Sequence, residues 1–338
     1  TLLLRSIDAD IVIRSAQYRD LSLANTVPRR RLYQVQDVPG VKSAEPLYVS
    51  TVVWKNPQTR LKTQLTLVGQ SVKTPAFNFP EVNQNLDKLK QADTFLFDRQ
   101  ARGSYAEVIA QAEQGKPIKT EIDRRSVQVV GLFSLGASFA TDGTLITSQE
   151  NFLRFFPERS PGQITLGLIK VQPGADPQQV LDQIKSILPQ DTIVSTHKDF
   201  VAFEQAYWEE TTPIGIVFTF GTVMAFVVGT VIVFQILSTD VNDHMGEYAT
   251  FKAMGYRDRY LLMIVFEEAV ILAVLGFFPG LGLALGQYAL IRNVAALPIS
   301  MTASRLTLVF FLTIAMCVIS GLIATRKLQS ADPADIFG

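Results

Sequence analysis

Residues 213–237 have the sequence PIGIVFTFGTVMAFVVGTVIVFQIL, which contains no charged side chain. A helix of roughly 20 apolar residues crosses the hydrocarbon core of a bilayer. Residues 260–290 and 306–325 have the same apolar character, interrupted only near the start of the first of them. One such helix could lie buried inside a soluble protein, but three in succession predict a membrane domain of three transmembrane helices.

Before residue 213 the chain has the composition of an ordinary soluble protein. Charged residues make up 18% of all 338 residues, against about 25% in a typical soluble domain, and the deficit lies mostly after Pro213. The sequence therefore predicts a soluble part joined to a membrane part. The net charge of +0 provides no overall field that would attract nucleic acid, so no nucleic-acid partner is expected.

Basic residues indicate how the chain crosses the membrane. They occur in the loop at 238–259 and in the tail at 326–338: Lys252, Arg257, Arg259, Arg326 and Lys327. The positive-inside rule favours a cytoplasmic position for both segments, although Arg292 and Arg305 lie between the later helices. Long domains are exempt from this rule, so we expect a membrane protein whose large N-terminal part lies outside the cytoplasm. The chain begins with Thr1 and shows no signal peptide, so a further transmembrane helix is expected upstream.

The soluble part shows a strand–helix–strand pattern near each of its ends. The expected helices are residues 28–38 and 177–188, and the expected strands are residues 10–13, 44–54, 61–68, 164–171 and 192–195. Two such units predict an α+β fold, a split ferredoxin-like, porter-type domain formed by residues 1–70 and 163–199.

Residues 71–162 are expected to form an inserted subdomain of mixed α/β type. Its expected helices are residues 81–91 and 104–114, and its expected strands are residues 94–97, 119–135 and 144–147. After the ferredoxin-like domain, residues 200–212 predict a helical stalk that leads into the first transmembrane helix.

The sequence lacks the residue patterns of an enzyme or of a metal site. Its two histidines, His197 and His244, flank a predicted transmembrane helix, and its one cysteine, Cys317, lies in an apolar stretch. No metal centre is therefore expected. Neither G-x-S-x-G nor G-x-x-x-x-G-K-[ST] occurs, so we expect neither a hydrolase nucleophile nor a phosphate-binding loop. Any work done by this chain would draw its energy from another chain.

The second predicted transmembrane helix carries two further features. Glu267 and Glu268 lie near one end of it, either at the membrane interface or facing a partner helix or water. Glycines at small-xxx-small spacing predict close helix packing, either within the chain or between subunits: Gly276, Gly280, Gly282 and Gly286.

The loop between the first two predicted transmembrane helices contains GEYATFKAMGYRDR at residues 246–259. This segment resembles the coupling segment of FtsX/MacB-type ABC transporter permeases, in which an acidic residue precedes an apolar-basic-Ala-apolar-Gly run. The residues that carry this resemblance, and hence the expected contact with an ATPase, are Glu247, Phe251, Lys252, Ala253, Met254 and Gly255.

Other positions both extend and limit the resemblance. Glu268 and Ala269 match an apolar-Glu-Ala step that the family has in its next helix, and one large outer domain followed by three spans is the family order. Gly246 stands where the family usually has Arg, and Ala324-Thr325 stands where it usually has Pro-Ala.

The resemblance implies a MacB-like (type VII) ABC permease without its first span and without a fused ATPase. A separate ABC ATPase would use ATP and Mg, the permease would form a homodimer, and this chain would be non-catalytic and bind no cofactor. Residues 3–12, LLRSIDADIV, look most like DevC-type permeases of cyanobacterial glycolipid exporters. That likeness implies a periplasmic membrane-fusion adaptor, an outer-membrane TolC-like channel and an envelope lipid or glycolipid as the exported substance.

Other functions compete with export. The same resemblance would fit a lipoprotein-releasing permease, or a division-type regulator that transmits a signal to cell-wall hydrolases, although the large outer domain disfavours the regulator. A membrane-anchored enzyme would need a catalytic constellation that the sequence lacks. Residues 247–255 could also be an inert connecting loop, but the apolar run Ala253-Met254-Gly255 would then be exposed without a purpose.

Overall fold

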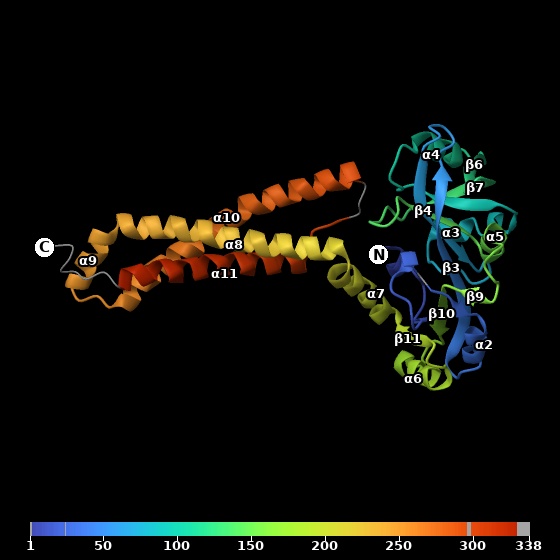
Figure 1. The fold of residues 1–338 in the computed structure, drawn as a ribbon, viewed down its shortest axis with the longest axis horizontal. Coiled ribbons are helices and arrows are strands. Elements are labelled where there is room, and N and C mark those ends of the chain that lie inside the picture. The colour runs from blue at the N-terminus through green and yellow to red at the C-terminus, as the bar shows by residue number, and fades with distance from the viewer. Residues whose placement is uncertain (1, 24, 296–298, 330–338) are drawn as a thin grey trace. The chain divides into compact units, whose positions relative to one another are not determined.

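The computed structural model describes residues 2–23, 25–295 and 299–329 and divides into two compact units, with the boundary between Thr212 and Pro213. Figure 1 shows that the first unit is built on β-sheet and the second on long helices. The boundary falls where the charged part of the sequence gives way to the uncharged stretch that begins at Pro213.

The two ends of the first unit together form an antiparallel sheet. Helix α2 (Arg30–Gln36) connects its first two strands in sequence, and helix α6 (Pro177–Ile187) connects its last two. The strands lie in the spatial order β11-β1-β10-β3 and are β1 (Ile11–Ser15), β3 (Val41–Lys55), β10 (Leu166–Val171) and β11 (Thr192–Thr196). These connections and this order confirm the predicted split ferredoxin-like fold.

Helix α6 forms because its sequence supplies a cap and an apolar face. The Asp176 side chain accepts a hydrogen bond of 2.9 Å from the backbone N–H two residues later, and Pro177 occupies the first turn. Val180 and Ile184 are buried against the sheet. A Cβ atom on Gly40 would lie 2.7 Å from Val180 Cγ2, so the turn after α2 requires glycine for close packing against α6.

The middle of the first unit forms a closed ring of strands. The ladder runs from the second half of β3 through each neighbour and returns to β3, where Trp54 is paired with Ile122. The other strands of the ring are β4 (Lys62–Gln70), β8 (Thr144–Ser148), β5 (Thr94–Asp98), β7 (Arg125–Phe133) and β6 (Ile118–Ile122). Trp54 and Phe97 pack inside with ring centroids 5.1 Å apart.

Because of this ring, the inserted subdomain begins earlier in the sequence than predicted. Strand β4 pairs with β3 and with β8, and neither pairing involves β1, β10 or β11. The ladder from β3 to β10 ends at Leu47, and the ladder from β3 to β4 begins at Tyr48. The border between the ferredoxin-like sheet and the ring therefore lies within β3, not after residue 70, because one long strand takes part in both.

Several expected elements of residues 71–162 are divided in the structure. The expected helix at 81–91 is a short helix α3 (Pro80–Gln84) and a 3-10 turn η2 (Lys88–Lys90). The expected strand at 119–135 is the hairpin of β6 and β7, because Asp123 and Arg124 adopt positive φ values of 46° and 69° and reverse the chain. The expected helix at 104–114 is α4 (Ala106–Glu113).

Several short elements of the first unit were not predicted from the sequence. Helix α5 (Gln149–Phe155) follows β8 and is capped by Ser148, whose hydroxyl accepts from Asn151 N at 3.1 Å. The expected strand at 164–171 is interrupted, since its start is a separate strand paired with another short one. The other short elements are α1 (Leu2–Arg5), η1 (Leu21–Leu23), β2 (Val27–Pro28) and β9 (Gln163–Ile164).

Helix α7 (His197–Ala206) ends the first unit and continues as a π-helical turn, η3 (Tyr207–Thr211). It begins earlier than the expected stalk because Thr196 caps it by accepting from Asp199 N. Glu204 is buried on α7 and accepts a hydrogen bond from the Tyr18 hydroxyl. This contact fixes α7 to the segment that follows β1.

Among its described residues, the second unit contains three helices that are long and apolar enough to cross a membrane. They are α8 (Pro213–Asp243), α10 (Asp258–Ala295) and α11 (Ala303–Gln329), and α9 (Met245–Ala253) joins the first two. Helix α8 continues past the expected end at residue 237. Helix α11 includes the first residues of the expected tail at 326–338, of which residues 330–338 lie outside the described residues.

Helices α8 and α11 pack closely through small residues. Ser320 Oγ donates a 2.8 Å hydrogen bond to the Thr230 carbonyl, and a Cβ atom on Gly229 would lie 2.6 Å from Met316 Sδ. By contrast, apart from the adjacent residues and backbone of α10 itself, no atom of the described residues lies within 4 Å of a Cβ built on the glycines singled out in the sequence: Gly276, Gly280, Gly282 and Gly286. Close packing within the chain is therefore not the role of those glycines, and packing between subunits stays a prediction.

Candidate functional site

Helix α9 is anchored on one face to the ends of its neighbours. Tyr248 and Ala249 are buried, and Tyr248 packs in a cluster with Val241 of α8 and with Leu261 and Val265 of α10. Because the buried positions are spaced as on one side of a helix, α9 has a fixed inner face. The coupling segment expected at residues 247–255 lies mostly on this helix, which begins at Met245 and ends at Ala253.

The opposite face of α9 is open. Its exposed residues are Gly246, Glu247, Thr250, Ala253 and Met254, and they follow the same helical spacing. Met254 is 61% exposed. Among the predicted coupling residues, Glu247, Ala253, Met254 and Gly255 are exposed, while Phe251 and Lys252 are half-buried. The first four are therefore available to another protein.

Phe251 and Gly255 form the C-terminal end of α9. Tyr256 N donates to the Phe251 carbonyl at 3.1 Å, and Gly255 N donates to the Lys252 carbonyl at 3.0 Å. Gly255 has φ +92°, and the Phe251 and Tyr256 rings lie 5.6 Å apart. This is a Schellman motif with its hydrophobic contact. Phe251 thus fixes the direction in which the chain leaves α9, which is a structural role rather than an open contact.

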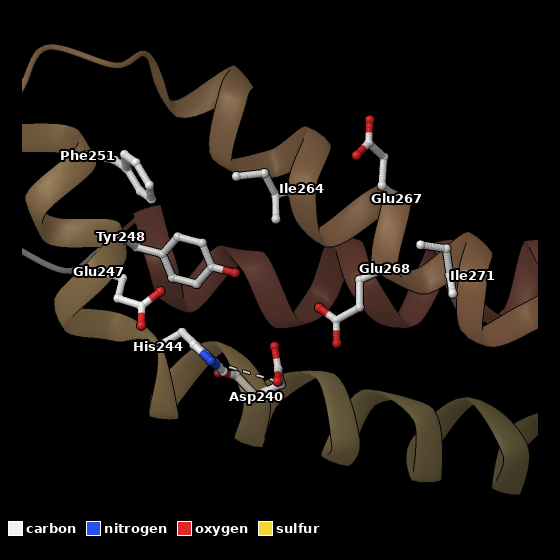
Figure 2. Close-up of a pocket in the computed structure, with 9 residues that line it drawn as sticks. All are labelled: Asp240, His244, Glu247, Tyr248, Phe251, Ile264, Glu267, Glu268 and Ile271. Atoms are coloured by element: carbon white, nitrogen blue, oxygen red, sulfur yellow. Dashed lines mark hydrogen bonds and ion pairs between the residues drawn. The ribbon is translucent and has the colours of Figure 1, made fainter.

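Carboxylates gather where α8 ends and α10 begins. Figure 2 shows the Glu268 carboxylate directed toward Asp240 of α8, whereas the Glu267 carboxylate points away from it. The side chain of His244 lies 3.6 Å from an Asp240 carboxylate oxygen. A hydrogen bond to the Asp240 carbonyl, together with the charge of Asp240, raises the pKa of His244. The two glutamates singled out in the sequence therefore have different surroundings.

These carboxylates lie at one end of the apolar stretches. Residues 213–239 of α8 and 269–291 of α10 carry no charged side chain, and each stretch is long enough for the hydrocarbon core. Asp240, Glu267 and Glu268 fall outside both stretches, on the side of α9. Length and composition therefore favour an interfacial position for the glutamates over one at mid-membrane.

Asp240 and Tyr248 were not singled out from the sequence, and His244 was noted there only as one of two histidines. They are spaced four residues apart at the junction of α8 and α9, a spacing that would place them on one helical face if the helix continued. That regularity could have singled them out. Within residues 2–23, 25–295 and 299–329 there is no group of three or more His, Cys, Asp or Glu residues that could hold a metal ion.

The helical unit matches a known protein family in sequence. Residues 219–333 match the family model described as FtsX-like permease C-terminal, a range that includes all but the first six residues of α8 together with α9, α10 and α11. A search of curated proteins gave no match.

Solved structures resemble this chain only distantly. The periplasmic region of MacB from Actinobacillus actinomycetemcomitans is 12% identical, with a TM-score of 0.38, and the alignment covers 62% of this chain and 97% of that one. The extracellular domain of the noncanonic ABC-type transporter YknZ from Gram-positive bacteria is 10% identical, with a TM-score of 0.37, covering 55% and 98%.

Proposed function

We propose that this chain is the permease subunit of an ABC transport complex in the inner membrane. The observation that carries the proposal is the open face of α9, which presents Glu247, Ala253 and Met254 at the end of two candidate spans. The match of residues 219–333 to the FtsX-like permease C-terminal family supports it. An apolar side chain as exposed as Met254 on an otherwise anchored helix favours contact with a partner.

The proposed partner is a separate ABC ATPase that uses ATP and Mg. In this proposal the chain itself is not an enzyme and binds no cofactor. Movement of the ATPase subunits would be passed to α9 and then to α8 and α10, which α9 contacts through Tyr248. The Schellman motif at Gly255 makes the corner after α9 stiff enough to pass that movement to α10.

The proposed outcome of this movement is export. Only Thr212 separates η3 from α8 in the sequence, so movement of α8 would be transmitted through a short connection to α7 and the first unit. The proposed further partners are a periplasmic membrane-fusion adaptor and an outer-membrane TolC-like channel, with an envelope lipid or glycolipid as cargo. Release of lipoproteins and regulation of wall hydrolases are the alternatives. Identification of proteins that co-purify with the complex would separate the three.

The coupling proposal can be tested by a substitution that places a charged side chain on the open face of α9. We expect Met254→Asp to lower both transport and the stimulation of ATPase activity at least about tenfold, because a buried unpaired charge costs several kcal/mol at an apolar contact. Folding should be retained because Met254 is largely exposed.

Two variants control this test. Asn242→Asp adds the same charge at an exposed position of α8 that lies outside α9, and Met254→Leu keeps an apolar side chain. Both should behave like the unaltered protein. Transport and ATPase stimulation that survive Met254→Asp would show that this face is not the coupling surface.

A further inference from the structure

A cavity of about 400 Å³ lies between the end of α8, helix α9 and the start of α10. Its lining combines six polar with three apolar residues. The polar ones are Asp240, His244, Glu247, Tyr248, Glu267 and Glu268, and the apolar ones are Phe251, Ile264 and Ile271. The elements that enclose it are held together by the cluster of Val241, Tyr248, Leu261 and Val265. The cavity is therefore formed by the packed junction of the helices and not by a loop.

The charge in this cavity is unbalanced. Asp240, Glu247, Glu267 and Glu268 contribute carboxylates, and among the described lining residues the only group that can carry a positive charge is the imidazole of His244, 3.6 Å from Asp240. Among the described residues, neither Glu247 nor Glu268 forms an ion pair with a lysine or arginine. Unpaired carboxylates next to an apolar region are costly, so a cation that enters the cavity would relieve this cost.

A second and independent feature points to a ligand. Tyr248 is only 7% exposed, and Figure 2 shows its hydroxyl group directed into the cavity. Within the described residues this hydroxyl has no hydrogen-bond partner. The hydroxyl is not among the fully buried, unpartnered polar atoms of the described residues, so it is accessible from the cavity. The cavity thus offers an acceptor or donor that the chain itself leaves unused.

We propose that this cavity binds a primary ammonium group. An ammonium has three N–H donors and one positive charge, which suits the facing carboxylates of Asp240 and Glu268 and the hydroxyl of Tyr248. Charge-assisted hydrogen bonds to carboxylates are the strong ones, and the rings of Tyr248 and Phe251 add surfaces that attract cations. Ile264 and Ile271 would accommodate the alkyl chain that carries the ammonium.

Two sources could supply this group, the headgroup of an amino lipid or a soluble polyamine. The position of the cavity at the end of the uncharged stretches of α8 and α10 places it at the level of lipid headgroups, and its open side also admits a soluble amine. The inference goes beyond the proposed function. Binding is measured without ATPase or nucleotide, so a failure of the export proposal would not affect the result.

The test uses the full chain in three bilayers. The first contains only phosphatidylcholine, the second contains added phosphatidylethanolamine, and the third is phosphatidylcholine titrated with spermidine. Native mass measurement counts lipid retained by the protein, and calorimetry follows spermidine. We expect Glu268→Gln and Asp240→Asn each to weaken ammonium binding about tenfold, the loss expected for one charge-assisted hydrogen bond. Asp243→Asn removes a carboxylate from an exposed position of α8 outside the cavity and should have no effect.

Each outcome decides the proposal. Retention of phosphatidylethanolamine that depends on Glu268 identifies a lipid headgroup, and spermidine binding with the same dependence identifies a free amine. If Glu268→Gln disturbs the fold in circular dichroism, Tyr248→Phe serves instead, since it removes only the hydroxyl, and it should weaken binding severalfold. Equal binding of both ligands to the unaltered protein and to these variants would overturn the proposal.

Discussion

Glu204 is the residue through which solution pH should act on the first unit. It is 1% exposed, its Oε1 accepts the Tyr18 hydroxyl, and its Oε2 has no hydrogen-bond partner within the described residues. The guanidinium of Arg14 is close but lies 3.8 Å over the Phe203 ring. Burial, and to a lesser extent the charge of Asp20, raises the pKa of Glu204 to about 6 from an ordinary value of 4.5.

The raised pKa of Glu204 determines whether the stability of the first unit increases or decreases with pH. Between about pH 4.5 and 6 the folded state binds more protons than the unfolded state. The contribution of Glu204 to the free energy of unfolding is therefore fully present below about pH 4.5 and is lost as the pH rises through about 6. The loss amounts to about 2 kcal/mol, or about thirtyfold in the opening equilibrium of α7. Hydrogen exchange of the α7 amides, corrected for intrinsic rates, should show this loss between pH 4.5 and 7.

Substitutions test whether the carboxylate of Glu204, and not another carboxylate, causes this pH dependence. Glu204→Gln cannot ionise, so the protection of α7 should become independent of pH across this range. Glu210→Gln, at an exposed position of η3, should keep the pH dependence of the unaltered protein. Protection in the unaltered protein that does not change between pH 4.5 and 7 would contradict the assignment.

At the scale of elements, Gly280 of α10 tests how the helices associate. Apart from the adjacent residues and backbone of α10 itself, no atom of the described residues lies within 4 Å of a Cβ on Gly280, so the Cβ added in Gly280→Leu meets no other described part of the same chain. If the glycine-containing face of α10 meets a second copy, the larger side chain should separate the helices and weaken the dimer at least about tenfold. Native mass measurement over a dilution series gives the dissociation constant.

The matched control for this test lies on another helix. Gly221 of α8 also has no neighbour within 4 Å among the described residues, and Gly221→Leu adds the same side chain to a different face. It should leave the dimer intact if α10 alone forms the contact. A monomeric unaltered protein that still transports would refute the homodimer.

Much of the element order could be predicted from the sequence. The strand–helix–strand patterns and the uncharged stretches are local, and local patterns reveal elements whatever their neighbours are. The ring of strands could not be predicted, because nothing within the fifteen residues of β3 indicates that its two halves have different partners. The β6–β7 turn was missed because Asp123-Arg124 contains no glycine or asparagine.

The candidate site was predictable only in part. The open face of α9 follows from its own sequence, and so does its end at Gly255. The meeting of Asp240, Tyr248 and Glu268 depends on how α8 and α10 pack, which no pattern within either helix specifies. Phe251 was assigned to the partner contact because it is apolar and lies in the matching run. In the structure it packs against Tyr256, since a Schellman motif requires an apolar contact of its own.

At the scale of the whole molecule, the orientation in the membrane is open to a direct test. We expect Gln111→Cys, at an exposed position of α4, to react with an impermeant thiol reagent added to intact spheroplasts. Thr250→Cys, at an exposed position of α9, should react only after the membrane is permeabilised. The one natural cysteine, Cys317, is buried and should give little background. Labelling of Gln111→Cys only after permeabilisation would reverse the proposed orientation.

The pairing of β1 also affects how the protein is made. Ile11 is paired with Ile169 on one side and with Thr196 on the other, so β1 has no partner strand until almost all of the first unit has been synthesised. Contacts between such distant residues form slowly because the loop between them must close first. During that interval β1 has two unpaired edges and an apolar sequence that can pair with other chains. We therefore expect the nascent chain to depend on a chaperone that holds β1 until β10 and β11 emerge.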